Sequence, residues 1–120
     1  MSEQTAIQWD KDADNIVTLT LDDPNQNANT MNELYARSMA DTVARLEKEA
    51  DDIAGVIITS AKSTFFAGGD LNDLLKAKEE DAPRIREGVE EIKRQLRVLE
   101  TLGKPVVAAM NGTALGGGLE

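Results

Sequence analysis

The sequence predicts an α/β fold built on a largely parallel sheet, and two observations carry this prediction. Segments with strand periodicity alternate with segments of helical periodicity along the chain, which is the order typical of parallel sheets with right-handed crossovers. The length of 120 residues and the hydrophobic content of 41% suit one domain with its own core. No internal repeat or low-complexity tract in the sequence indicates another architecture.

The N-terminal part of the chain predicts two strands followed by a helix. Residues 6–9 form one short apolar run, and residues 16–21 form a second run in which apolar and polar side chains alternate. We expect a hairpin or two adjacent strands. Residues 30–33 then have the spacing of a helix capping box. Behind them, apolar side chains recur at steps of three and four and predict one helical face: Met31, Leu34, Tyr35, Met39, Val43 and Leu46.

The second half predicts strand, short helix, long helix and strand. Residues 56–58 are a β-branched run that we expect to be a strand buried on both faces. A loop over residues 60–69 follows, and Asp70 can cap a short helix. Residues 83–102 are expected to form the longest helix, ended by a glycine, before a buried strand at residues 106–110. Its apolar spacing of four and three also suits a coiled-coil seam, but packing on a sheet is the commoner case for one such helix.

Composition excludes several classes of function. The 22 acidic and 13 basic residues give a net charge of −9, which argues against a nucleic-acid or anionic-membrane surface. The sequence has no Cys and no His, so it provides no disulfide, no Cys/His zinc site and no Ser-His or Cys-His triad. Acid–base chemistry falls to carboxylates, Lys, Tyr or backbone groups. The polar start and the absence of a long apolar run predict a cytoplasmic protein.

Two glycine-bearing segments each follow a predicted buried strand. One is residues 65–70 and the other is residues 116–118, and both positions are where open α/β sheets bind ligands. Glycine lets a ligand approach the backbone closely, and two facing turns can supply fixed amide donors to a developing negative charge, as in an oxyanion hole. Glycine-rich turns that bind nothing are the commoner case, so the residues alone leave both interpretations open. The spacings that mark dinucleotide sites and P-loops are absent from the sequence.

Together these segments resemble the crotonase (enoyl-CoA hydratase/isomerase) superfamily. Residues 65–70, Phe-Phe-Ala-Gly-Gly-Asp, resemble the family segment F-x-A-G-x-D. Residues 104–120 resemble its segment K-P-x-x-A-A-x-N-G-x-A-x-G-G-G-x-E, and the likeness is greatest to the N-terminal hydratase domain of multifunctional fatty-acid oxidation α subunits. The resemblance implies a crotonase-like (ClpP/crotonase) ββα spiral. It also implies that residues 1–120 are a single domain, the N-terminal half of that fold, truncated at its C-terminal end.

The resemblance further implies an enoyl-CoA hydratase, which adds water across the 2,3 double bond of trans-2-enoyl-CoA in fatty acid β-oxidation. By position, the two oxyanion-hole amides fall on Ala67 and Gly117, and the first catalytic Glu falls on Glu120. A Glu at this position favours hydration over double-bond isomerisation. The implied substrate-binding positions are Ala28, Ala67, Gly68, Gly69, Asp70 and Gly117.

The implied ligand is an acyl-CoA thioester, with no metal or redox cofactor, because coenzyme A is part of the substrate. The family implies a homo-oligomer, a trimer, or a place in a fatty-acid oxidation complex. The second catalytic Glu of the family has no counterpart in the sequence, so we expect little hydratase activity from these 120 residues. Isomerase or other crotonase chemistry, and a catalytically incomplete acyl-CoA-binding fragment, are the alternatives. Lys62 is a candidate for a CoA phosphate, although a solvated surface position is commoner for such a lysine.

Overall fold

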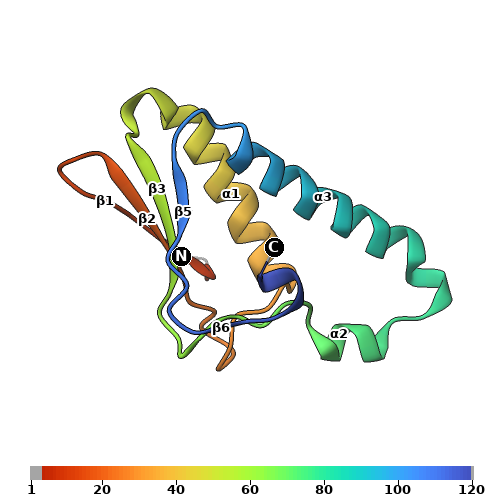
Figure 1. Cartoon of the computed structure of the whole chain (residues 1–120). Coiled ribbons are helices and arrows are strands. Elements are labelled where there is room, and N and C mark those ends of the chain that lie inside the picture. Colours follow the sequence, from red (N-terminus) through yellow and green to blue (C-terminus); the bar gives the residue numbers. More distant parts are fainter. Residues whose placement is uncertain (1–3, 120) are drawn as a thin grey trace.

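The fold is α/β, as predicted, with a sheet on one side and two long helices beside it (Figure 1). The computed structural model describes residues 4–119. The strands are β1 (Ile7–Lys11), β2 (Ile16–Leu21), β3 (Gly55–Ser60), β4 (Thr64–Phe66), β5 (Val106–Ala108) and β6 (Thr113–Ala114). The helices are α1 (Glu33–Glu49), α2 (Leu71–Lys76) and α3 (Ala82–Glu100), with 3-10 turns η1 (Ala50–Asp52), η2 (Glu79–Asp81) and η3 (Gly116–Gly118).

The main sheet has the strand order β1-β2-β3-β5. Strands β1 and β2 pair antiparallel, with Ile7 opposite Leu21, and this confirms the predicted hairpin. The pairs β2–β3 and β3–β5 are both parallel, with Val17 opposite Val56 and Val56 opposite Val106. Three strands of the sheet therefore end at the same edge, and the chain leaves that edge toward the glycine-bearing segments.

A second, two-stranded sheet was not predicted from the sequence. Strands β4 and β6 pair parallel, with Thr64 opposite Thr113 and Phe66 opposite Ala114. The sequence predicts a loop for the β4 residues, and that prediction is wrong. Three residues are too few to show the alternation that marks a strand, although Thr and Phe both favour extended backbone.

Helix α1 covers one face of the main sheet, and α3 lies along α1 (Figure 1). The apolar face predicted for α1 is largely confirmed, because Tyr35, Met39, Val43 and Leu46 are all buried. They join the core with Ile53, which precedes β3, and with residues of both sheets and α3: Ile7, Val17, Leu19, Leu21, Val56, Phe65, Phe66 and Leu99. Helix α3 packs against α1, where the side-chain amide of Gln95 donates to the carbonyl of Ala36 at 3.0 Å. Its Leu96 and Leu99 also line a small hollow with Ile58 of β3, so the expected packing on a sheet is confirmed in part.

The ends of the long helices are set by one side chain and one glycine. Asn32 caps α1, since its Oδ1 accepts from the backbone N–H of Tyr35 at 2.8 Å. Thr30, the cap predicted from the sequence, instead donates its hydroxyl to Gln26 at 3.2 Å. Gly103 ends α3 as predicted, with a φ of +83° that glycine adopts without strain.

Several apolar side chains are more exposed than the sequence suggested. Strand β3 is not buried on both faces, because Ile57 and Ile58 are only half-buried. Val107 on β5 is 58% exposed, and the leucines of α2 (Leu71, Leu74 and Leu75) are 60–85% exposed. Among the described helices, none combines the length and the apolar character needed to cross a membrane.

Candidate functional site

The two glycine-bearing segments predicted to form a site lie against each other. Strand β4 leads into one and β6 into the other, and the N–H of Leu115 donates to the carbonyl of Phe66 at 3.0 Å. A Cβ atom placed on Gly68 would lie 2.8 Å from the Leu115 oxygen and 3.4 Å from the Gly117 nitrogen. The backbones are therefore in van der Waals contact at Gly68, and the predicted proximity of the two turns is confirmed.

This close approach needs glycine on both sides of the contact. A Cβ on Gly118 would overlap the carbonyl oxygen of Phe66, and a Cβ on Gly112 would overlap the carbonyl oxygen of Ser63. A Cβ on Gly117 would meet only the end of the flexible Met31 side chain, 2.7 Å from its Cε. The glycines thus bring one backbone onto the other, and they also hold the amide of Gly117 at the junction.

The Ala67 amide does not match the role that the resemblance assigned to it. Its N–H donates to the backbone carbonyl of Asn29 at 2.8 Å, so it is already satisfied within the fold and is not available to a bound oxygen. Gly69, two residues further on, is exposed. Within residues 4–119, no acceptor is found for the amide of Gly69 or for that of Gly117. The amides of Gly68 and Gly116 have no acceptor there either, but of these four only Gly69 and Gly117 line a hollow in the surface. Gly69 and Gly117 are therefore the candidate pair of donors beside the junction.

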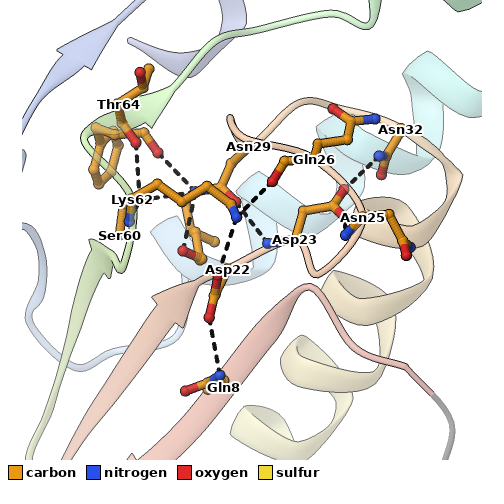
Figure 2. Close-up of polar contacts among 12 residues, drawn as sticks. Gln8, Asp22, Asp23, Asn25, Gln26, Asn29, Asn32, Ser60, Lys62 and Thr64 are labelled. Atoms are coloured by element: carbon orange, nitrogen blue, oxygen red, sulfur yellow. Dashed lines mark hydrogen bonds and ion pairs between the residues drawn. The ribbon is translucent and has the colours of Figure 1, made fainter.

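The turn at residues 67–69 rests on a buried polar cluster that was not predicted from the sequence. Figure 2 shows Asn29 between the end of β2, Ser60 at the end of β3 and the start of β4. Asp23 is only 2% exposed, and its carboxylate accepts from the N–H of Asn25 at 2.8 Å and from Asn32 at 2.7 Å. The sequence presents these residues as a polar break between strand and helix, and only their burial distinguishes them from an ordinary loop.

Lys62 takes part in this cluster and not in a solvated surface. Its side chain is 13% exposed, and its Nζ lies 3.2 Å from a carboxylate oxygen of Asp22. The same ammonium donates to the backbone carbonyl of Gln26 at 2.8 Å. Figure 2 shows it reaching across to the loop that follows β2. Both contacts hold that loop, and the burial contradicts the solvated surface position expected for Lys62.

The remaining predicted positions fall close to the junction or outside the described residues. Asp70 directly precedes α2, and its Oδ1 accepts from the N–H of Asp73 at 3.4 Å, which agrees with the predicted capping role. The other oxygen of Asp70 accepts from Gln26 at 3.2 Å. Ala28 is half-buried in the loop that precedes α1, beside the residue that binds the Ala67 amide. Glu120 lies outside the described residues.

Two hollows flank the junction, and Met31 lines both of them. The larger is an open cleft of about 850 Å³ that begins at Gly69 and Asp70 and runs between α2 and the start of α3. The smaller, of about 130 Å³, has a mainly apolar lining that includes Gly117, Gly118 and Phe66. Burial beside this lining raises the pKa of Tyr35 to about 12, and its ring meets Phe66 edge-on with centroids 5.0 Å apart. Each free amide therefore adjoins a hollow.

Comparison with known proteins gives consistent matches. The family model described as enoyl-CoA hydratase/isomerase matches residues 11–120. The chain is 39% identical to the fatty acid oxidation complex subunit alpha of Vibrio parahaemolyticus over all of its length, and 36% identical to that of Psychrobacter cryohalolentis over 89% of it. It spans only 17% and 15% of those relatives. A crystal structure of enoyl-CoA hydratase from Bacillus anthracis superimposes with a TM-score of 0.81 at 31% identity, covering 95% of this chain and 43% of that one.

Proposed function

The chain belongs to the enoyl-CoA hydratase/isomerase family, and from that membership we propose that the protein is an enoyl-CoA hydratase. Such an enzyme adds water across the 2,3 double bond of trans-2-enoyl-CoA in fatty acid β-oxidation. The observation that carries the proposal is the backbone contact at Gly68, which sets the unused amides of Gly69 and Gly117 at one junction between two hollows.

The two amides are proposed to bind the thioester carbonyl oxygen of the substrate. When the oxygen of water bonds to C3, electrons move through the conjugated system and negative charge gathers on the carbonyl oxygen; C2 then takes up a proton. The charge on that oxygen is larger in the transition state than in the substrate, so the amide donors lower the barrier. Removal of one such donor typically costs about 10²–10³ in rate.

Acid–base work is proposed for Glu120, acting as base toward the attacking water. This assignment rests on the position of Glu120 in the family motif, because the residue lies outside the described part of the structure. A carboxylate suits a sequence that has no His and no Cys. Water addition leaves the overall oxidation level of the substrate unchanged, so the proposed reaction uses no redox cofactor, and coenzyme A enters as part of the substrate.

The proposed partners follow from the relatives. Proteins named as alpha subunits of a fatty acid oxidation complex match this chain over most or all of its length, and this supports a place in such a complex. A homo-oligomer is the alternative that the family resemblance implies. The same relatives support a cytoplasmic location. Ala28, Gly68 and Asp70 are proposed to lie along the bound acyl-CoA, since they surround the junction that holds the amides.

A direct assay mixes the 120-residue chain with crotonyl-CoA and follows the loss of enoyl absorbance. We expect only weak hydration from these 120 residues, since the second catalytic Glu has no counterpart in the sequence. Weak hydration that disappears in Glu120→Gln and persists in Ser63→Ala, an exposed control, would support the proposed enzyme. Carbonyl-dependent binding of butyryl-CoA without hydration would favour the acyl-CoA-binding alternative. A double bond that shifts without addition of water would favour isomerase chemistry. Equal binding of butyryl-CoA and of its thioether analogue, which has no carbonyl, would overturn the proposed role of the amides.

A further inference from the structure

Asn29 is the centre of the polar cluster beneath the glycine turn. It is only 3% exposed, in the loop between β2 and α1. Its side-chain Oδ1 accepts from the N–H of Asp23 at 2.9 Å. Its Nδ2 lies 3.1 Å from the carbonyl of Leu21, 2.9 Å from Oγ of Ser60 and 3.3 Å from the carbonyl of Phe65. One side chain therefore joins the ends of β2 and β3 to strand β4.

The backbone of Asn29 holds the same strand from a second point. Its carbonyl accepts from the N–H of Ala67 at 2.8 Å. Between the two residues that Asn29 binds lies Phe66, whose carbonyl accepts from Leu115 at 3.0 Å at the entrance to the second glycine segment. Asn29 therefore binds the residues on both sides of Phe66, and Phe66 in turn binds the segment that leads into residues 116–118.

The chain after Asn29 continues this pairing up to the donor amide. The N–H of Met31 donates to the carbonyl of Gly68 at 2.8 Å, and Met31 and Gly69 form a parallel bridge. Residues 29–31 thus run beside residues 65–69. The register of the two segments is set at the Asn29 end, and the amide of Gly69 lies at the other end.

An asparagine suits this position because the neighbouring backbone offers both hydrogen-bond acceptors and a hydrogen-bond donor. Carbonyl oxygens of Leu21 and Phe65 face its Nδ2, and the N–H of Asp23 faces its Oδ1. Oγ of Ser60 accepts from Asn29 and donates to the carbonyl of Thr64 at 3.0 Å (Figure 2). An aspartate here would add a negative charge to the buried Asp23 and place it against the carbonyl oxygens of Leu21 and Phe65. An alanine would leave the buried N–H of Asp23 without its side-chain acceptor.

We propose that Asn29 is a positioning residue for the carbonyl-binding site, which it serves by holding residues 67–69 so that the Gly69 amide faces the same ligand oxygen as the Gly117 amide. The inference rests on the proposed function, since it presumes that the two amides bind a thioester carbonyl. Asn29 does not itself touch the substrate. Its loss is expected to misalign one donor while the rest of the ligand contacts persist.

The test measures recognition of the carbonyl separately from binding of CoA. Titration calorimetry on the 120-residue chain compares butyryl-CoA with S-butyl-CoA, the thioether that lacks the carbonyl. Because two hydrogen bonds are at stake, the wild-type chain is expected to prefer the thioester by about 10-fold or more. Asn29→Ala is expected to reduce that preference to about 3-fold or less, with the affinity for the thioether within about 2-fold of wild type.

Val43→Ala is the matched control, because Val43 is buried on α1 at 1% exposure, away from the turn. It is expected to destabilise the fold and to keep the full thioester preference, so a general loss of stability would not imitate the Asn29 effect. Equal preference in Asn29→Ala and wild type would overturn the inference and leave the proposed function standing. A wild-type chain without any preference would overturn both.

If the Asn29→Ala variant does not fold, a measurement on the unmodified chain still tests the proposal. In a nitrogen–proton correlation spectrum, the side-chain amide signals of Asn29 are expected to shift when butyryl-CoA is added and to stay in place with S-butyl-CoA. The reason is that a hydrogen bond from the Gly69 amide to a bound carbonyl would move the turn, and Asn29 is hydrogen-bonded to that turn through Phe65 and Ala67. Signals that respond equally to both ligands, or to neither, would overturn the proposed positioning role.

Discussion

Replacement of Gly68 by alanine is the perturbation that most directly tests the contact between the two glycine turns. Gly68 has a φ of +90°, a backbone conformation that residues with a Cβ rarely adopt. The added Cβ would also lie 2.8 Å from the carbonyl oxygen of Leu115. That oxygen belongs to the backbone and cannot rotate away as the end of a side chain could, so the two strands of the second sheet would have to separate.

The expected cost follows from these two terms. A strained φ costs about 1–3 kcal/mol, and an overpacked contact costs about 1–3 kcal/mol more. We expect Gly68→Ala to lower the free energy of unfolding by about 2–6 kcal/mol, which is a large part of the stability of a domain this size. Urea unfolding followed by circular dichroism measures the change.

Gly69→Ala supplies the matched control at the neighbouring position. A Cβ there would meet no heavy atom within 4 Å, and its φ lies outside the left-handed region. Its effect on the free energy of unfolding should stay within about 0.5 kcal/mol, as for other unconstrained surface changes. Equal stabilities for the two variants would refute the reasoning, because they would mean that the turns do not meet at Gly68.

Two further predictions concern α1. Asn32→Ala removes the cap of α1 and a partner of the buried Asp23 carboxylate, and should destabilise the chain by about 1–2 kcal/mol in urea unfolding. A larger loss of stability in Thr30→Ala would contradict this and show that Thr30 is the cap of α1. The raised pKa of Tyr35, about 12 against an ordinary 10.0, means that the unfolded state loses this proton first, so stability is full below pH 10 and falls as the pH rises toward 12. Tyr35→Phe should lessen that alkaline loss by roughly 2–3 kcal/mol, and alkaline unfolding curves of equal slope for the two chains would contradict it.

The parts of the fold that periodicity describes could be predicted from sequence. Alternation in residues 16–21 and the helical spacing from Tyr35 to Leu46 each reflect which face meets the core, and both elements formed as expected. Strand β4 could not be found in this way, because three residues show no period. The packing of α3 against α1 could not be predicted, because it depends on how much of the sheet the other elements leave uncovered in the folded protein.

The site could be located from the sequence, but its donors could not be assigned. Motif spacing placed the two turns correctly, and the contact at Gly68 followed from glycines that only a close approach explains. Whether an amide is free depends on which distant carbonyl it meets. The Ala67 amide meets Asn29, 38 residues earlier in the chain, and nothing within the motif shows that partner. The solvated position expected for Lys62 was wrong for the same reason, since Asp22 and Gln26 lie against its ammonium in the fold.

The infrared spectrum of bound butyryl-CoA carrying a ¹³C-labelled thioester carbonyl tests the central claim most directly. Two backbone N–H groups that donate to one oxygen weaken the carbonyl bond. The stretch of the labelled carbonyl should therefore move to lower wavenumber on binding, and it should move back when Gly69→Pro removes one donor. A bound ligand whose carbonyl absorbs at the same wavenumber as free butyryl-CoA in water would contradict the account.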